Sequence, residues 1–108
     1  MANKFNAKKV EYDGIKFDSR KECAHYIMLK DKEIRGIIKN LKTQVKYELL
    51  PRNERFKPTI YIADFVYEVD GVEVVEDVKG LRKGAAYSLF KIKQKLMYDK
   101  FKILVNEI

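Results

Sequence analysis

Residues 59–80, TIYIADFVYEVDGVEVVEDVKG, carry the clearest strand and turn signals of this chain. Their first half is rich in β-branched and aromatic residues, which favour a strand. Asp70-Gly71 is the signal for a tight type I′ turn, and a second apolar run follows it. The stretch therefore predicts an antiparallel hairpin with strands over 59–69 and 72–79.

Shorter elements surround this hairpin. Asp13-Gly14 predicts a first hairpin from strands over 9–12 and 15–17, and Ser19 with Glu22 forms the capping box of a helix that stops near Gly36. The remaining pattern predicts a strand over 43–50, a polar loop over 51–58, a helix over 85–99 and a last strand over 101–105. We expect a single α/β (α+β) domain over 1–108, with an N-terminal β-hairpin in 1–18. Residues 19–108 would form an αβββαβ core, a mixed central sheet flanked by helices.

Apolar spacing also predicts which side of each helix carries its stripe. On the first helix, Cys23, Ile27 and Ile34 lie on one stripe, and Glu22, Tyr26 and Leu29 flank it. On the second helix, the clustered aliphatic residues are Leu89, Ile92 and Leu96.

Composition excludes several classes of protein. One cysteine and one histidine cannot build a disulfide framework or a structural zinc site. No long apolar run and no apolar N-terminal stretch occur, so we expect a cytoplasmic protein that does not bind membranes. The chain has no Gly-rich phosphate loop, and no nucleotide cofactor is expected.

The positive charge is concentrated in one segment. The chain carries 23 Lys and Arg against 16 Asp and Glu, a net charge of +7, and residues 79–102 account for this excess. Such a segment indicates binding to a polyanion, above all nucleic acid, although a solvated helix face is the alternative. The expected DNA contacts are Arg82, Lys83, Ser88, Lys91 and Lys95.

Charged residues interrupt the two central strands. Strand alternation places Asp77 and Lys79 on one face, and a hairpin without a bulge sets Asp64 opposite Asp77, with Cβ atoms about 5 Å apart. Two carboxylates this close favour a divalent cation such as Mg²⁺ or Mn²⁺, and Lys79 could act on a water or a phosphate. The alternative is that Asp64 and Lys79 form only a buried ion pair.

Asp64, followed by Asp77-Val78-Lys79 on the next strand, resembles the motif of the PD-(D/E)xK nuclease superfamily, with Ala63 in place of the proline. The wider pattern is similar to small phage endonucleases that resemble Holliday junction resolvases. Its four motifs are VEYDGIKFDSRKE, YIADFVYEVDG, VVEDVKG and YSLFKIKQKL. The resemblance implies a restriction-endonuclease-like core and metal-dependent DNA cleavage by a homodimer. It also implies that Asp64, Asp77 and the Val78 carbonyl hold the metal, that Lys79 is catalytic, and that Glu22 completes the site.

Several roles stay open at this point. Glu22 is either a site residue or only the glutamate of the capping box. Glu76 would replace Asp77 as ligand if the strand register shifted by one, although strand parity favours Asp77. Gln44 is either a polar site residue or an exposed strand residue. Cys23 and His25 point apart on a helix, so a cysteine hydrolase dyad is excluded, and His25 is expected at the surface.

Three functions are compatible with these observations. The first is a Mg²⁺-dependent endodeoxyribonuclease that acts on branched DNA such as Holliday junctions, in phage recombination or replication. The second is a noncatalytic nucleic-acid-binding protein. The third is the nuclease subunit of a larger machine that acts on linear duplex. The pair of Asp64 and Asp77 favours an enzyme, because a buried anionic pair repels DNA and gives a pure binder no advantage.

Overall fold

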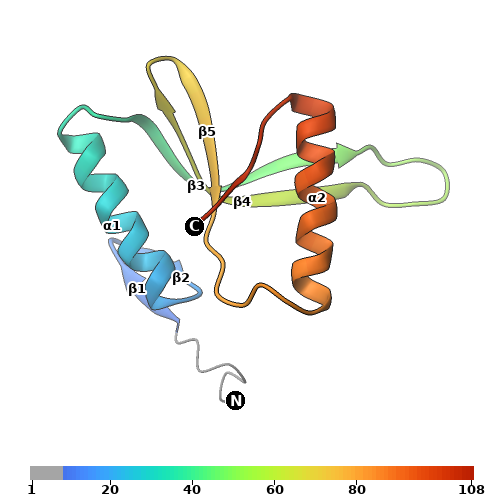
Figure 1. Ribbon diagram of the computed structural model, residues 1–108, viewed down its shortest axis with the longest axis horizontal. Helices are drawn as coiled ribbons and strands as arrows, with labels where there is room; N and C mark the ends of the chain where they lie inside the picture. Colours follow the sequence, from blue (N-terminus) through green and yellow to red (C-terminus); the bar gives the residue numbers. More distant parts are fainter. Residues whose placement is uncertain (1–8) are drawn as a thin grey trace.

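A four-stranded sheet forms the centre of the computed structural model, which describes residues 9–108. Its order is β3-β4-β5-β6, with antiparallel pairing between the first three strands and parallel pairing between the last two. Figure 1 shows this sheet between two helices, with a separate small hairpin below α1. The strands of the sheet are β3 (Lys39–Leu50), β4 (Thr59–Val69), β5 (Val72–Asp77) and β6 (Asn106–Glu107).

The predicted order of elements is confirmed, and the fold is α+β. The hairpin of β1 (Val10–Tyr12) and β2 (Ile15–Phe17) precedes α1 (Arg20–Ile34), and α2 (Ala85–Phe101) connects β5 to β6. Residues 1–8 of the predicted N-terminal segment lie outside the described residues.

The β4–β5 hairpin forms as predicted. Asp70 and Gly71 both have positive φ, 50° and 80°, which is the backbone of a type I′ turn. Phe65 pairs with Glu76 and Val69 pairs with Val72, so the register has no bulge. β4 spans the predicted residues, whereas β5 ends two residues earlier than predicted, at Asp77.

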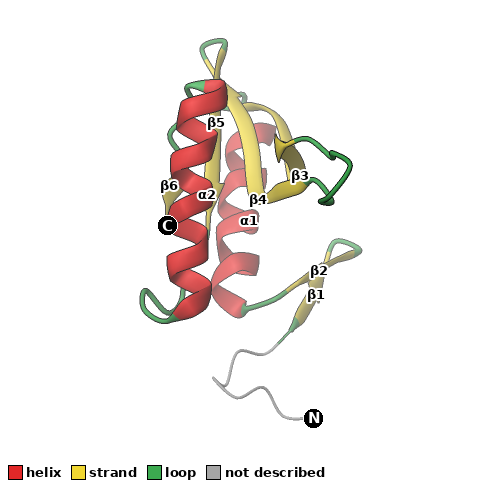
Figure 2. Cartoon of the chain, turned by 90° about the vertical axis from the view of Figure 1, so that its right-hand side faces the viewer, coloured by secondary structure: helices red, strands yellow, loops and turns green. Residues whose placement is uncertain are grey.

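The two helices cover opposite faces of the sheet. Phe90 and Met97 of α2 pack in a core cluster with Val75, whereas Tyr26 and Leu29 of α1 pack in a second cluster that Val74 borders. Successive residues of a strand point to opposite faces, so the clusters lie on either side of β5. Figure 1 shows α1 and α2 on either side of β5, and in Figure 2, turned by 90°, α2 lies in front of α1.

The predicted stripe on α1 is wrong for its two isoleucines. Ile27 and Ile34 are exposed, and the buried residues are Glu22, Cys23, Tyr26 and Leu29. A count of aliphatic residues alone misses this face because two of its members are polar. Their polar atoms are satisfied, since the Tyr26 hydroxyl donates to Asp13 and Glu22 accepts from the Asp18 amide.

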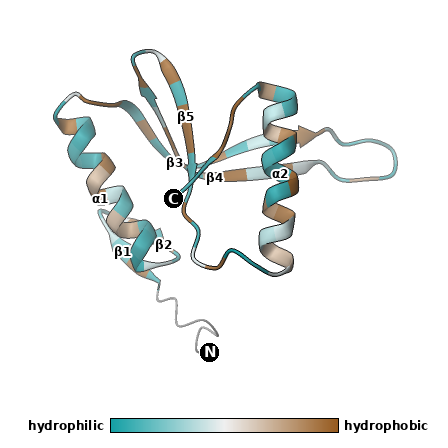
Figure 3. Ribbon diagram, viewed as in Figure 1, coloured by the Kyte–Doolittle hydropathy of each residue, from teal (hydrophilic) through white to brown (hydrophobic). Residues whose placement is uncertain are grey.

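The predicted stripe on α2 is also displaced. Phe90 and Met97 are buried and Leu96 is half-buried, whereas Leu89 and Ile92 are exposed. Figure 3 shows the mixed hydropathy along this helix. Phe90 and Met97, seven residues apart on one side of the helix, take the core position in place of the more numerous aliphatic residues.

The last strand is shorter than predicted and lies elsewhere. Phe101 belongs to α2, which ends at Lys102 in the left-handed conformation, with its amide donating to the Tyr98 carbonyl. The strand comprises only Asn106 and Glu107, and Val105 is buried just before it. The first predicted strand of the core is longer than expected, since β3 starts at Lys39.

Candidate active site

The end of β5 separates two acidic residues onto the two faces of the sheet. Glu76 points toward α1. One of its oxygens accepts a hydrogen bond from the Tyr67 hydroxyl (2.7 Å), and the other contacts the His25 ring (2.6 Å). Asp77 points toward α2, where it pairs with Lys79 (2.8 Å). The predicted strand parity is therefore confirmed as geometry, and Asp77 shares a face with Lys79.

Asp77 has a partner for each of its carboxylate oxygens. The Tyr61 hydroxyl donates to Oδ2 at 2.6 Å, and the Lys79 ammonium contacts Oδ1. Burial raises the pKa of Asp77, the two hydrogen bonds lower it, and the nearby Asp64 charge raises it again. The Lys79 ammonium also lies 3.7 Å from the centre of the Phe90 ring, which fixes it in place by a cation–π contact.

Asp64 lies where β4 turns its side chains from one face to the other. Ala63 belongs to the core cluster under α2, whereas Phe65 belongs to the cluster under α1, although residues two apart on a regular strand share a face. The local cause is on the neighbouring strand. There Gln44 has a φ of 53°, a left-handed conformation rare for a residue with a side chain.

This irregular point lets Asp64 reach the end of β5. Its Oδ2 accepts from the Val78 amide at 2.9 Å, and its Oδ1 accepts from the Gln44 side chain at 3.2 Å. Gln44 is thus an exposed strand residue that also contacts the site. Lys79 pairs with Asp77, and the structure shows no ion pair between Asp64 and Lys79 among residues 9–108.

Glu22 both caps α1 and contacts Asp64. The Ser19 hydroxyl accepts from the Glu22 amide, as a capping box requires, but the Glu22 carboxylate accepts from the Asp18 amide in place of the Ser19 amide. Burial and a hydrogen bond with the Asp64 carboxyl group raise the pKa of Glu22 to about 8. Two carboxyl groups can hydrogen-bond to each other only if one of them is protonated and donates. A Glu22 that keeps its proton at neutral pH supplies that donor to Asp64.

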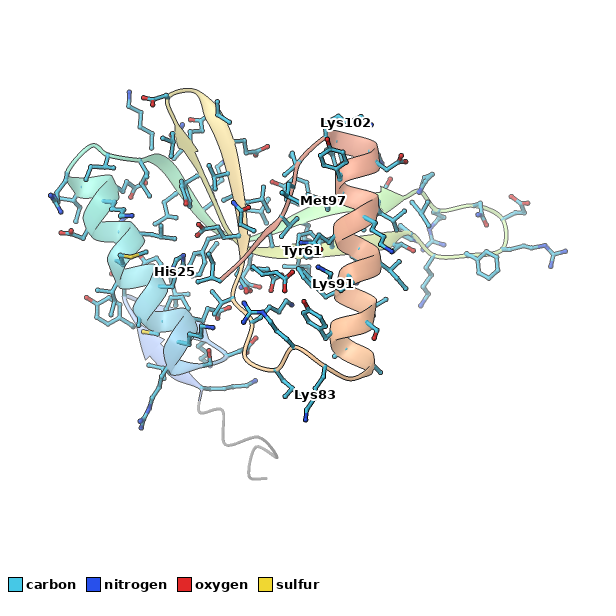
Figure 4. The ribbon with its side chains drawn as sticks, in the orientation of Figure 1. His25, Tyr61, Lys83, Lys91, Met97 and Lys102 are labelled. Carbon is cyan, nitrogen blue, oxygen red and sulfur yellow. The ribbon has the colours of Figure 1, made fainter. Side chains whose placement is uncertain are left out.

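A groove gives access to Asp77 and Lys79 on the α2 side. Its volume is about 270 Å³, and Tyr61 and Phe90 line it together with Asp77 and Lys79. Ile60 and Ile62 of β4 and Leu89 and Lys93 of α2 also belong to its lining. Figure 4 shows Tyr61 near the middle of the molecule, between the sheet and α2.

Lys21 fixes the start of α1 to this region. Its ammonium donates to the carbonyl oxygens of Lys79 (2.7 Å) and Ile108 (3.0 Å). The Lys79 amide in turn donates to Ile108, and the Ile108 amide donates to the Asp77 carbonyl. The backbone on both sides of Val78 is therefore held from α1 and from β6.

The donors at this point fit a hard divalent cation in their chemistry. Mg²⁺ is usually held by one or two carboxylates and keeps several waters, and Asp64 and Asp77 supply two carboxylates. Residues 9–108 contain no group of three or more His, Cys, Asp or Glu side chains placed to hold a metal ion. The candidate ligands are therefore the two carboxylates of Asp64 and Asp77. Glu22 contacts Asp64 but not Asp77.

A family model described as "Protein of unknown function (DUF1064)" matches residues 2–107, nearly the whole chain. The chain belongs to the DUF1064 family. No curated protein and no solved structure matches this DUF1064 chain. Within residues 9–108 it has no helix that is both long enough and apolar enough to span a membrane.

The DNA contacts expected from the sequence of this DUF1064 chain fall into two groups. Arg82 and Lys91 both pair with Glu107, at 3.4 Å and 2.9 Å. Hydrogen bonds from Tyr87 and Lys91 lower the pKa of Glu107 to about 2. Figure 4 shows Lys91 on α2 and Lys83 in the loop before it. Lys83, Ser88 and Lys95 are exposed.

The sequence does not predict the contacts of four residues near the end of β5 and in the groove. Tyr61 has no motif that marks it, because it lies three positions before Asp64 and regular alternation would place the two on opposite faces. Lys93 belongs to the groove although the sequence favours Lys91 and Lys95. His25 was expected at the surface, but its side chain is only 11% exposed because it pairs with Glu76. Lys21 bonds only to backbone oxygens, which the sequence does not reveal.

Proposed function

We propose that this chain is a metal-dependent endonuclease that hydrolyses DNA phosphodiester bonds, with branched DNA such as Holliday junctions as its substrate. The observation that carries the proposal is that Asp64 accepts from the Val78 amide, between Asp77 and its partner Lys79, and that Asp77 and Lys79 line an open groove. A structural ion pair needs only one carboxylate, and a second one nearby costs stability unless a cation or a proton offsets the repulsion. The resemblance to PD-(D/E)xK nucleases supplies the reaction class.

In this proposal Asp64, Asp77 and the Val78 carbonyl hold Mg²⁺ or Mn²⁺, and Glu22 assists through Asp64. The bound cation would polarise a phosphate oxygen and make a coordinated water more acidic. Tyr61 orients the Asp77 carboxylate by its hydrogen bond. Lys79, held between Asp77 and Phe90, stabilises negative charge that develops on the phosphate.

The basic segment supplies the phosphate contacts. Lys83, Ser88 and Lys95 have exposed side chains, and Lys93 lies at the groove itself. Arg82 and Lys91 contribute less, because Glu107 already neutralises them in part. Symmetric cutting of a four-way junction needs two sites, so we propose that the protein acts as a homodimer, in the cytoplasm of the cell that carries it.

A cleavage assay tests the proposal. We expect the chain to cut a four-way junction in Mg²⁺ faster than a flap or a linear duplex, and to be inactive in EDTA. Asp64→Asn should abolish cleavage and leave DNA binding intact, because it removes a negative charge near the phosphate. Asp70→Asn is the matched control, since Asp70 lies in the exposed turn of the same hairpin and asparagine suits that turn.

The competing function is a noncatalytic DNA-binding protein. One observation favours it, namely that both Asp77 oxygens already have partners in Tyr61 and Lys79. Junction binding with no cleavage of any of the three DNAs in Mg²⁺ or Mn²⁺ would establish this function and reject the nuclease. Fast cutting of linear duplex with no preference for the junction would instead indicate a nuclease subunit that acts on linear DNA.

A further inference from the structure

The outer halves of β3 and β4 form an arm that extends beyond the rest of the sheet. β5 pairs with β4 only from Val69 to Phe65, so the β4 residues before this point pair with β3 alone. Figure 1 shows the two strands and their connecting loop, residues 51–58, reaching past α2. A two-stranded hairpin is marginal in isolation, so this arm needs support from the body.

α2 supplies that support at the base of the arm. The Lys100 ammonium donates to the Glu48 carbonyl at 2.7 Å, and the Phe101 ring meets the Tyr47 ring edge-on at 5.6 Å. Leu49 is buried in the core cluster under α2. The arm is therefore anchored on the helix that also forms one side of the groove, and its position relative to the site is fixed.

The tip of the arm has a preformed loop. The Asn53 side chain accepts hydrogen bonds from the amides of Arg55 (2.8 Å) and Phe56 (2.9 Å), and the Asn53 amide donates to the Phe56 carbonyl (3.1 Å). This is the short-range bonding by which asparagine stabilises turns. It holds Phe56 in a loop where its side chain is 69% exposed.

Positive charges surround this ring. Residues 51–58 contain Arg52, Arg55 and Lys57 against Glu54 alone, although residues 1–78 as a whole are near neutral. All three cations are exposed, and none of them forms an ion pair with another residue in the part of the chain that the structure describes. Figure 3 shows the loop as mainly hydrophilic. A single exposed aromatic residue is ordinary, but one among three unpaired cations on a supported projection is the pattern of a nucleic-acid contact.

We infer that the tip of this arm binds DNA at a branch point, where Phe56 stacks on a base that has lost its neighbour and Arg52, Arg55 and Lys57 contact the flanking phosphates. An aromatic ring stacks on a base only where the base is accessible, which is so at junctions and in single strands and not inside a matched duplex. Ile60 and Ile62 of β4 continue from the arm into the groove beside Asp77 and Lys79. The inference rests on the proposed function and assigns its preference for branched DNA to the arm.

Binding measured in EDTA separates this inference from the nuclease proposal, because no cleavage is needed. The probes are a four-way junction with 2-aminopurine at the branch and a linear duplex of the same sequence, followed by fluorescence anisotropy and by 2-aminopurine fluorescence. Phe56→Ala should weaken junction binding about 10-fold or more, as expected for one lost stacking contact, and should leave duplex binding within a few-fold. Phe56→Trp should restore junction binding. Val72→Ala, which truncates an exposed residue at the other hairpin tip, is the control and should change neither affinity.

The three cations have a separate readout. Substituting Arg52, Arg55 and Lys57 together by alanine should reduce the slope of log K against log salt by about 3 on the junction. The inference is overturned if Phe56→Ala weakens junction and duplex equally, or neither, or if the triple variant keeps the wild-type salt slope. If one of these results is found and the wild-type protein cuts the junction in Mg²⁺, the inference about the arm is rejected and the nuclease proposal is retained. The expected binding results without any Mg²⁺-dependent cutting would reject the nuclease and retain the arm as a DNA contact.

Discussion

Glu76 and Asp77 are neighbours in the chain, both are buried, and each bonds to one tyrosine and one basic side chain, yet their surroundings differ. Glu76 lies under α1, where its partners Tyr67 and His25 are themselves almost covered. Asp77 lies beside a groove and has a second carboxylate, Asp64, as a neighbour. A buried acid with a closed set of partners stabilises the packing of a helix, whereas a buried acid that borders a groove and has a second carboxylate nearby is accessible to a ligand from that side.

The largest difference should separate these two acids directly. Asp77→Asn should lower the cleavage rate about 10³-fold, since a metal contributes several kcal/mol of charge stabilisation to such a reaction. Glu76→Gln should leave the rate within a few-fold of wild type, because Glu76 points to the other face of the sheet. Single-turnover cleavage of a junction measures both. The reverse ranking would show that the site is on the α1 side of the sheet.

The basic partners of the two acids should differ in the same way. Lys79→Ala should reduce cleavage about 10²-fold through lost stabilisation of the transition state. His25→Ala should retain cleavage and lower the free energy of unfolding by about 1–3 kcal/mol, because it leaves the buried Glu76 carboxylate short of a partner. Urea unfolding and cleavage at a temperature where both variants are folded provide the two readouts. A cleavage defect in His25→Ala as large as that in Lys79→Ala would remove the distinction between the faces.

The pair of Glu22 and Asp64 should also give the protein a pH dependence in metal-free buffer. Glu22 has a pKa of about 8 in the folded chain against an ordinary value of 4.5, so the folded state retains a proton that the unfolded chain releases. The stabilisation is complete below about pH 4.5 and is lost as the pH rises toward 8. Glu22→Gln should flatten this decline, by an amount of the order of 1–3 kcal/mol at pH 8. The check is thermal unfolding of both proteins in EDTA from pH 5 to 8, and parallel curves for the two would contradict it.

The two tyrosines allow a smaller and cleaner comparison, because each substitution removes one hydroxyl group. Tyr61→Phe should raise the Mg²⁺ concentration that gives half-maximal cleavage about 10-fold, as is typical when a residue that orients a metal ligand is lost. Tyr67→Phe should leave that concentration unchanged and cost about 1 kcal/mol of stability. Titration of the cleavage rate with Mg²⁺ distinguishes them. Equal Mg²⁺ dependence in both variants and wild type would mean that Tyr61 only supports the fold.

The sequence predicts this site to the extent that regular strand geometry applies. The turn at Asp70-Gly71 sets the register of the β4–β5 hairpin, which pairs Phe65 with Glu76, the residues next to Asp64 and Asp77. Tyr61 could not be predicted, because its contact with Asp77 depends on the irregular point at Asp64 and Gln44, where alternation fails. The stripes on both helices were misplaced for a related reason. Burial followed the large side chains and the satisfied polar groups, and a count of aliphatic residues identifies neither.

The smallest expected effect concerns the lysines of α2. Their substitution tests whether DNA reaches Asp77 and Lys79 through the groove. If each unpaired lysine neutralises one phosphate, Lys93→Ala should reduce the slope of log K against log salt by about 1. The double variant Lys91→Ala, Lys95→Ala should also reduce it by about 1 and not by 2, because Lys91 already pairs with Glu107 and releases few counterions from DNA. Anisotropy titrations of a junction in EDTA at several salt concentrations give the slopes. A fall of about 2 in the double variant, with no change for Lys93→Ala, would place the DNA along the Lys91 side of α2, away from the groove beside Asp77.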